Sequence, residues 1–297
     1  MKRRGNYKFL DKFSHYVPGI GGMFALLAWL LVGALLGGVV VVVLSLALGS
    51  DFVTEYGALI SYPVMFIPPM IYASNKSAAN AMSQPGWKLD SSHFSPLGAV
   101  KCVLLALIVT VALSFWTDAL VCLLPDMPPA LKAAMEQLTQ GSIWVNFLSV
   151  SIFAPICEEW LCRGMVLRGL LQGSKMKPVW AIVISAAFFA LIHMNPWQAI
   201  PAFLMGCIFG LVYYRTGSLK LTMFMHFANN TMALTIGHID ALKDVDNWMD
   251  IMPLNYYILT AVACFMLTVL VVLAYMKIKP QRPEGSFDEV PSLFEAE

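Results

Sequence analysis

Two adjacent glutamates, with an arginine one helical turn further on, interrupt a strongly apolar stretch of this chain. They are Glu158, Glu159 and Arg163. On insertion scales an ionised side chain at the centre of a membrane helix costs roughly 2.5–3.5 kcal/mol, so three facing lipid would cost roughly 8–10 kcal/mol. A chain that keeps such groups in an apolar setting is expected to use them. We interpret the cluster as a candidate functional site.

The spacing gives the two glutamates different tasks. Glu159 and Arg163 are four residues apart, so they share one face of a helix and can form an ion pair. Glu158 points about 100° away, because a helix has about 3.6 residues per turn. It is left without that partner, as a general base requires. Pro155, just before the pair, removes a backbone hydrogen bond and is expected to open the helix to water.

Two further polar clusters follow in apolar segments. His193 ends the run Phe189–His193, and His226 and Asn230 share a helical face at a spacing of four residues. The alternative is a polar network that only holds helices together, at roughly 0.6–2 kcal/mol per contact. Because that gain is small beside the insertion cost, we favour a functional site.

The composition indicates which elements position these groups. Of the 297 residues, 59% are hydrophobic and 12% are charged, against about 25% charged in a typical soluble domain. We therefore predict an all-α integral membrane protein with about eight transmembrane helices around an intramembrane polar active-site cavity. The eight apolar runs span about 23–49, 57–75, 102–124, 143–170, 178–195, 199–214, 219–236 and 254–277.

The basic residues predict the orientation of the chain. Residues 1–12 carry five Lys or Arg, and the even-numbered connections and the C-terminal tail carry most of the others. The opposite side has Lys132 and Lys243 among eight acidic residues. Because cytoplasmic loops are rich in Lys and Arg, both termini are predicted to be cytoplasmic, with the cavity open to the same side. The expected location is a bacterial inner membrane.

We divide the chain into five parts. These are a cytoplasmic segment 1–22, N-terminal transmembrane helices and loops 23–141, a core 142–236, an outer loop with the last helix 237–278, and a cytoplasmic tail 279–297. Gly33 and Gly37 are spaced for close helix packing. The six cysteines all lie in apolar stretches and are predicted to be free rather than disulfide-bonded.

Three motifs in this order resemble the signatures of one family. The patterns Glu158-Glu159-x-x-x-Arg163, Phe189-x-x-x-His193 and His226-x-x-x-Asn230 are similar to those of the CPBP family. Its members are CAAX-type prenyl proteases and bacteriocin-processing enzymes, also called the Abi family. The resemblance covers about Ser142 to Ile236 and implies an intramembrane endopeptidase.

The resemblance also implies roles for the candidate catalytic residues. Glu158 would activate a water as general base, beside Glu159, and His193 would position that water. His226 and Asn230 would stabilise the oxyanion, for which imidazole and amide N–H groups are suited. Arg163 would keep a structural ion pair. No cofactor is favoured, because the His-Glu-x-x-His spacing of zinc proteases is missing. A zinc-dependent metalloprotease remains the alternative, with Glu158, His193 and His226 as ligands.

Other functions stay open at this stage. The chain would act on a membrane-associated or lipidated protein or peptide within the lipid bilayer, whereas its net charge of +1 indicates no nucleic-acid partner. A non-catalytic scaffold or a bacteriocin-immunity factor could carry the same motifs. A transporter could use the carboxylates as a proton relay, but the chain shows no internal repeat.

Overall fold

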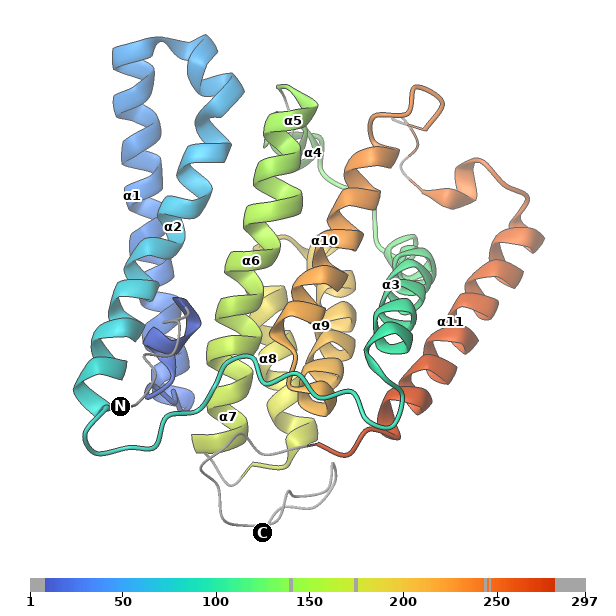
Figure 1. Cartoon of the computed structure of the whole chain (residues 1–297). Coiled ribbons are helices and arrows are strands. Elements are labelled where there is room, and N and C mark those ends of the chain that lie inside the picture. Colours follow the sequence, from blue (N-terminus) through green and yellow to red (C-terminus); the bar gives the residue numbers. More distant parts are fainter. Residues whose placement is uncertain (1–8, 139–140, 174–175, 243–244, 246, 281–297) are drawn as a thin grey trace.

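Helices make up all the regular structure in the described part of the chain. The computed structural model describes residues 9–138, 141–173, 176–242, 245 and 247–280, and no strand occurs among them. Each of the eight predicted apolar runs contains a helix (Figure 1). The short helices outside these runs are η1 (Phe9–Phe13), α4 (Pro129–Leu138) and η4 (Trp248–Asp250). The predicted all-α membrane class is confirmed.

Six helices in the described residues are long and apolar enough to cross a membrane. They are α1 (Ile20–Leu48), α2 (Ser50–Asn80), α3 (Ala99–Val121), the rod Ile143–Gly173, α9 (Pro196–Thr216) and α11 (Leu254–Met276). Helix α8 (Pro178–Ile192) is apolar but has only 15 residues. Helix α10 (Leu219–Ile236) has 18 residues and carries polar side chains of the candidate site. The number eight for transmembrane helices therefore stays a prediction.

The rod Ile143–Gly173 forms the centre of the arrangement in Figure 1, with the α1–α2 hairpin on one side and α8, α9, α10, α3 and α11 on the other. It is built of α5 (Ile143–Asn146), η2 (Phe147–Phe153), α6 (Ala154–Glu159), η3 (Trp160–Leu167) and α7 (Arg168–Gly173). Both η2 and η3 are π-helical. Such wider turns are frequent at functional sites.

The α1–α2 hairpin packs through glycine, as the spacing of Gly33 and Gly37 predicted. A Cβ atom added at Gly33 would lie 1.9 Å from the carbonyl oxygen of Met65, and one at Gly37 would lie 3.0 Å from that of Ser61. The two backbones can approach this closely because neither glycine has a side chain. The six cysteines are free, as predicted.

Arg168 closes the end of the molecule at which η1 lies. It begins α7 and is only 2% exposed. Its guanidinium donates to five backbone carbonyls, which satisfies its donors and makes its burial tolerable. These belong to Phe13, Ser14, Tyr16, Trp87 and Gly164, at 2.6–3.4 Å. The N-terminal segment and the loop after α2 are thus fastened beneath the rod.

Candidate active site

The two glutamates end α6, between the two π-helical segments, and face different surroundings. Glu158 is 9% exposed and lines a cavity, whereas Glu159 is fully buried. Their separate orientations follow from the helical step between neighbours. The predicted division between a cavity-facing carboxylate and a buried one is therefore present in the structure.

Glu159 and Arg163 form the ion pair that their spacing predicted. The Arg163 Nη1 atom lies 2.7 Å from Glu159 Oε1, and both side chains are fully buried. Nη2 donates to the carbonyl of Gly206 at 3.2 Å, and the guanidinium lies over the rings of Phe189 and Phe209, at 4.6 and 5.4 Å from their centroids. Because the buried guanidinium contacts residues of both α8 and α9, the pair anchors these helices to the rod.

His226 bridges the two glutamates from α10. Its Nδ1 lies 3.1 Å from Glu159 Oε1, and its Nε2 lies 3.9 Å from Glu158 Oε2. Since Glu159 also neutralises Arg163, its carboxylate is ionised and can only accept, so His226 Nδ1 carries the proton of this bond. In the neutral ring Nε2 is then unprotonated and faces Glu158. A second proton on Nε2 would give an imidazolium held between two carboxylates.

Tyr62 reaches the site from α2 and was missed by the sequence analysis. Its hydroxyl donates to Glu158 Oε1, and the two residues are 96 positions apart in the chain. The other oxygen, Glu158 Oε2, is buried and accepts no hydrogen bond from the described residues. Tyr62 therefore holds one carboxylate oxygen, while the other lies 3.9 Å from His226 Nε2. No local spacing in the sequence could indicate this contact.

Pro155 explains the position of Asn230. The N–H of Ala154 is bonded to the carbonyl of Ser149, five residues back, and Pro155 has no N–H. The carbonyl of Val150 therefore lacks both of the donors that an α- or π-helical continuation would supply. Asn230 Nδ2 donates to that carbonyl at 2.8 Å, so α10 completes the hydrogen bonding of the rod.

A chain of hydrogen bonds fixes the Asn230 amide further. Ser114 Oγ donates to Asn229 Oδ1 at 2.7 Å, and Asn229 Nδ2 donates to Asn230 Oδ1 at 3.2 Å. With its oxygen and one N–H engaged, Asn230 has one amide N–H left for a ligand.

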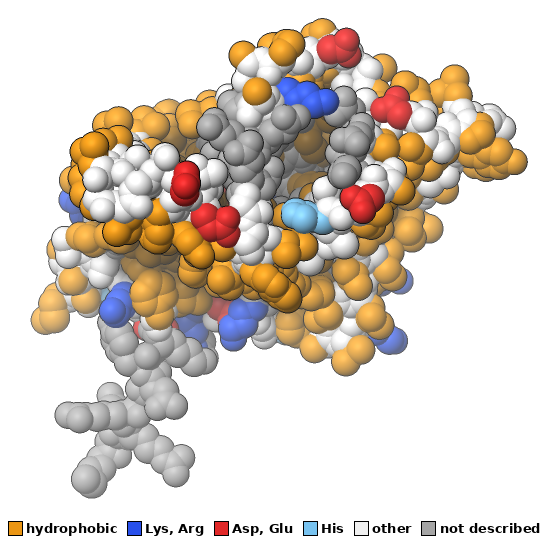
Figure 2. Space-filling model, turned by 90° about the horizontal axis from the view of Figure 1, so that it is seen from above, with side chains coloured by type: hydrophobic (Ala, Val, Ile, Leu, Met, Phe, Trp, Pro, Cys, Tyr) orange, Lys and Arg blue, Asp and Glu red, His pale blue; other side chains and the backbone are white. Residues whose placement is uncertain are grey.

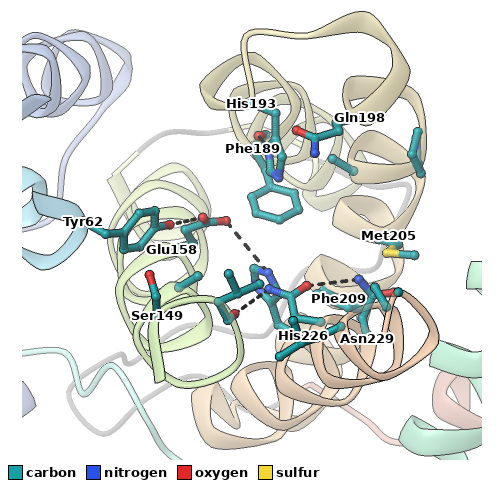
Figure 3. A pocket seen from close by; sticks show the side chains of 18 of the residues that line it. Tyr62, Ser149, Glu158, Phe189, His193, Gln198, Met205, Phe209, His226 and Asn229 are labelled. Carbon is teal, nitrogen blue, oxygen red and sulfur yellow. Dashed lines mark hydrogen bonds and ion pairs between the residues drawn. The ribbon is translucent and has the colours of Figure 1, made fainter. Parts of the chain in front are cut away.

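His193 follows directly after α8, behind the ring of Phe189. Its Nδ1 lies 2.8 Å from the Phe189 carbonyl, which can only accept, so Nδ1 carries the proton and Nε2 is unprotonated in the neutral ring. The Phe189 ring makes edge contacts with His193 and with His226, at centroid distances of 4.9 and 5.5 Å. His193 is thus on the wall of the site, on the far side of this ring from His226 (Figure 3).

These side chains border one cavity of about 620 Å³, a size typical of sites that enclose a ligand. Glu158, His193, His226 and Asn230 line it, and Tyr62 closes one side (Figure 3). Much of the remaining wall is apolar, from Ala154, Phe189, Pro201, Ala202, Met205, Phe209, Ala233 and Leu234. Gln198, Asn229 and His238 add polar groups.

The donors do not fit a three-ligand zinc site as they are arranged. Within the described ranges, no three His, Cys, Asp or Glu side chains converge closely enough to hold a metal ion. Of the predicted set, Glu158 Oε2 and His226 Nε2 approach each other to 3.9 Å. The third member, His193, lies beyond the Phe189 ring.

Comparison with known proteins places the site in a family context. Residues 140–232 match the family model described as "Type II CAAX prenyl endopeptidase Rce1-like". The chain is also 34% identical over 86 residues to the membrane-embedded CAAX protease MroQ of Staphylococcus aureus (strain USA300). That match covers 27% of this chain and 34% of the relative, so the two are similar over about a third of the relative's length. No solved structure matches significantly.

The matched residues contain all three motifs, from Glu158 to Asn230. The resemblance to the CPBP and CAAX-protease family that those motifs indicated is confirmed for this segment. Helices α1, α2 and α11 lie outside the matched range, so Tyr62 is an addition to the site from a part of the chain that the family model does not cover.

Proposed function

We propose that the chain is an intramembrane endopeptidase of the CAAX-protease type, which hydrolyses a peptide bond of a membrane-associated or lipidated substrate. One observation carries the proposal. Glu158 lines a cavity of about 620 Å³, and its buried Oε2, without a hydrogen bond from the described residues, lies 3.9 Å from His226 Nε2. A carboxylate held ready beside an imidazole in an enclosed space is suited to activating water.

In the proposed reaction, Glu158 Oε2 takes a proton from water, and the water oxygen attacks the carbonyl carbon of the substrate. The C–N bond then breaks, and the proton passes from Glu158 to the leaving amine. No covalent enzyme intermediate is required. His193 Nε2, which is unprotonated in the neutral ring, orients the water from the opposite wall. General acid–base catalysis of this kind contributes about 10²–10⁴-fold to a rate.

Two hydrogen-bond donors on α10 would stabilise the oxyanion of the tetrahedral intermediate. The remaining N–H of Asn230 is one of them. The other is His226 Nε2, which donates when the ring is protonated on both nitrogens. Glu159 holds the ring in place, since it accepts from Nδ1 at 3.1 Å. Glu159 is therefore assigned a positioning role for His226, comparable to a carboxylate that orients a catalytic histidine.

Tyr62 is assigned a positioning role for the base. Its hydrogen bond occupies Glu158 Oε1, which orients the carboxylate and leaves Oε2 on the side of His226. A hydrogen bond to an ionised group contributes about 1.5–3 kcal/mol. The α1–α2 hairpin thus takes part in the site as well as in the packing.

Mapping of protein termini tests the proposal. Membrane proteins from cells with wild-type chain are compared with those from cells carrying Glu158→Gln, at matched protein levels. Termini that occur only with wild type are expected, because glutamine cannot accept the proton from water. Cys157→Ser is the matched control, since this neighbour has no place in the proposed chemistry, and it should give the wild-type termini. Identical termini in all three, with any phenotype intact, would instead indicate a binding or immunity role.

A further inference from the structure

The cavity extends from the middle of the helices toward one end of the molecule. On α8 and α9 its lining runs from the turn between these helices, at His193 and Gln198, along α9 to Phe209. On α10 the lining runs from His226 past the helix end to His238, and on the rod it begins at Ser149 in an early turn. The first turns of the rod and the end of α10 lie toward the end opposite the N-terminal segment, and the α8–α9 turn lies near the middle of the rod (Figure 1).

The view from that end shows the opening. Figure 2 presents a hollow with hydrophobic side chains in its depth. His238 contributes to the wall and is exposed, whereas His226, deeper in the site, is only 5% exposed. The exposure of the lining therefore increases toward this face.

At the opposite end of the same helices, packed side chains leave no opening among the described residues. Arg168 fastens the N-terminal segment and the loop after α2 beneath the rod. Next to it, the side chains of Leu161, Leu167, Leu170 and Leu219 are completely buried. A substrate cannot reach Glu158 from this end without unpacking the core.

The charges indicate which side of the membrane the open end faces. Around the filled end, the acidic Asp11 and Asp90 are outnumbered by the basic residues Lys12, Lys76, Lys88, Lys101, Lys177, Lys220, Lys277 and Lys279. Around the open end, the described acidic residues include Asp51, Glu55, Asp126, Asp240 and Asp250, with Lys132 as the described cation. Because Lys and Arg gather on the cytoplasmic side, the filled end is cytoplasmic and the open end is not.

We infer that the site opens to the non-cytoplasmic side of the membrane, and that its substrate is an apolar segment of an exported or membrane-inserted protein cleaved on that side. The part of this inference that concerns a substrate rests on the proposed function. The side on which the cavity opens is argued from geometry and charge alone. It replaces the expectation of a cavity open to the cytoplasm. The apolar wall from Pro201 to Phe209 suits an uncharged stretch of peptide.

Labelling of introduced cysteines tests the sidedness without any substrate. His238→Cys places a thiol at the open end, and Lys277→Cys places one on an exposed position at the other end. Each is compared with the unsubstituted chain, which carries the same six native cysteines. A membrane-impermeant maleimide should label the His238→Cys chain in intact cells, and the Lys277→Cys chain only after permeabilisation. The reverse pattern would overturn the inference and leave the proposed protease untouched.

The positions of the cleaved bonds test the substrate class. Termini that depend on Glu158 are mapped onto the membrane topology of the proteins that carry them, and they should lie on the non-cytoplasmic side or in the outer half of a membrane helix. Cleavage confined to cytoplasmic segments would refute the inference. If no terminus depends on Glu158, the proposed function fails, while the labelling result still decides the sidedness.

Discussion

Asn230 has two separable tasks, and a double-mutant cycle with Pro155 distinguishes them. In the first task its amide supplies the donor that the Val150 carbonyl lacks, at 2.8 Å. Asn230→Ala removes that donor and leaves a carbonyl unpaired in the interior of the membrane protein. Pro155→Ala introduces a backbone N–H five residues after Val150, which can continue the π-helical pattern to the same carbonyl. We therefore expect the second change to relieve the effect of the first.

The expected sizes follow from the cost of an unpaired buried group, about 1–3 kcal/mol. Asn230→Ala should lower the free energy of unfolding by this amount when Pro155 is present, and by much less in a chain that already carries Pro155→Ala. The coupling should be about 1–2 kcal/mol, within the range found for groups in direct contact. The assay is denaturant unfolding of the four detergent-solubilised proteins. Thr235→Ala, an exposed position on α10 whose hydroxyl bonds within its own helix, is the control and should be additive with Pro155→Ala.

Activity should follow a different pattern from stability. If the second N–H of Asn230 serves the oxyanion, Asn230→Ala lowers the rate by about 10²–10³-fold in both backgrounds. An equal loss of stability with and without Pro155 would refute the explanation of the Val150 contact. Activity restored by Pro155→Ala would show that Asn230 acts only through the position of the helices.

Two further results are expected. Tyr62→Phe should lower kcat/KM by roughly ten- to a hundredfold, because it removes a hydrogen bond to Glu158 worth about 1.5–3 kcal/mol. Tyr256→Phe, at an exposed position of α11, is the control and should leave kcat/KM unchanged. Equal kinetics for the two variants would show that Tyr62 has no role in the site. Exhaustive chelation should leave cleavage intact, and stoichiometric zinc whose removal abolishes turnover would overturn the metal-free reaction.

Local spacing was enough to predict the helices and the Glu159–Arg163 ion pair. The apolar runs are long, and a separation of four residues places two side chains on one helical face whatever the rest of the chain does. The same rule brought His226 and Asn230 to one side of α10. That these residues line one cavity with Glu158 could be expected only from the resemblance to a family, because no pattern within one helix specifies its neighbours.

Other features of the site depend on contacts between distant parts of the chain. Tyr62 belongs to an apolar helix, and nothing nearby in the sequence separates it from a packing residue. The role of Pro155 was predicted in part, as a break in the backbone hydrogen bonding. The sequence predicted that the break opens the helix to water. In the structure the carbonyl of Val150 accepts a hydrogen bond from Asn230 on α10. Only the structure shows which donor replaces the missing one.

The side that we infer for the opening illustrates why depth along a helix is a poor guide to access. A count of 1.5 Å per residue from the helix ends places Glu158 roughly 22 Å from the start of its helix, and so nearer the cytoplasm. The rod, however, contains two π-helical segments, whose rise differs from that of an α-helix. More importantly, distance to an end does not determine whether that end is open. Access depends on which end is filled by side chains, and here Arg168 and its carbonyl partners fill the end that bears most of the basic residues. On the inference drawn above, Glu158 is therefore reached from the non-cytoplasmic end, through the opening that His238 borders.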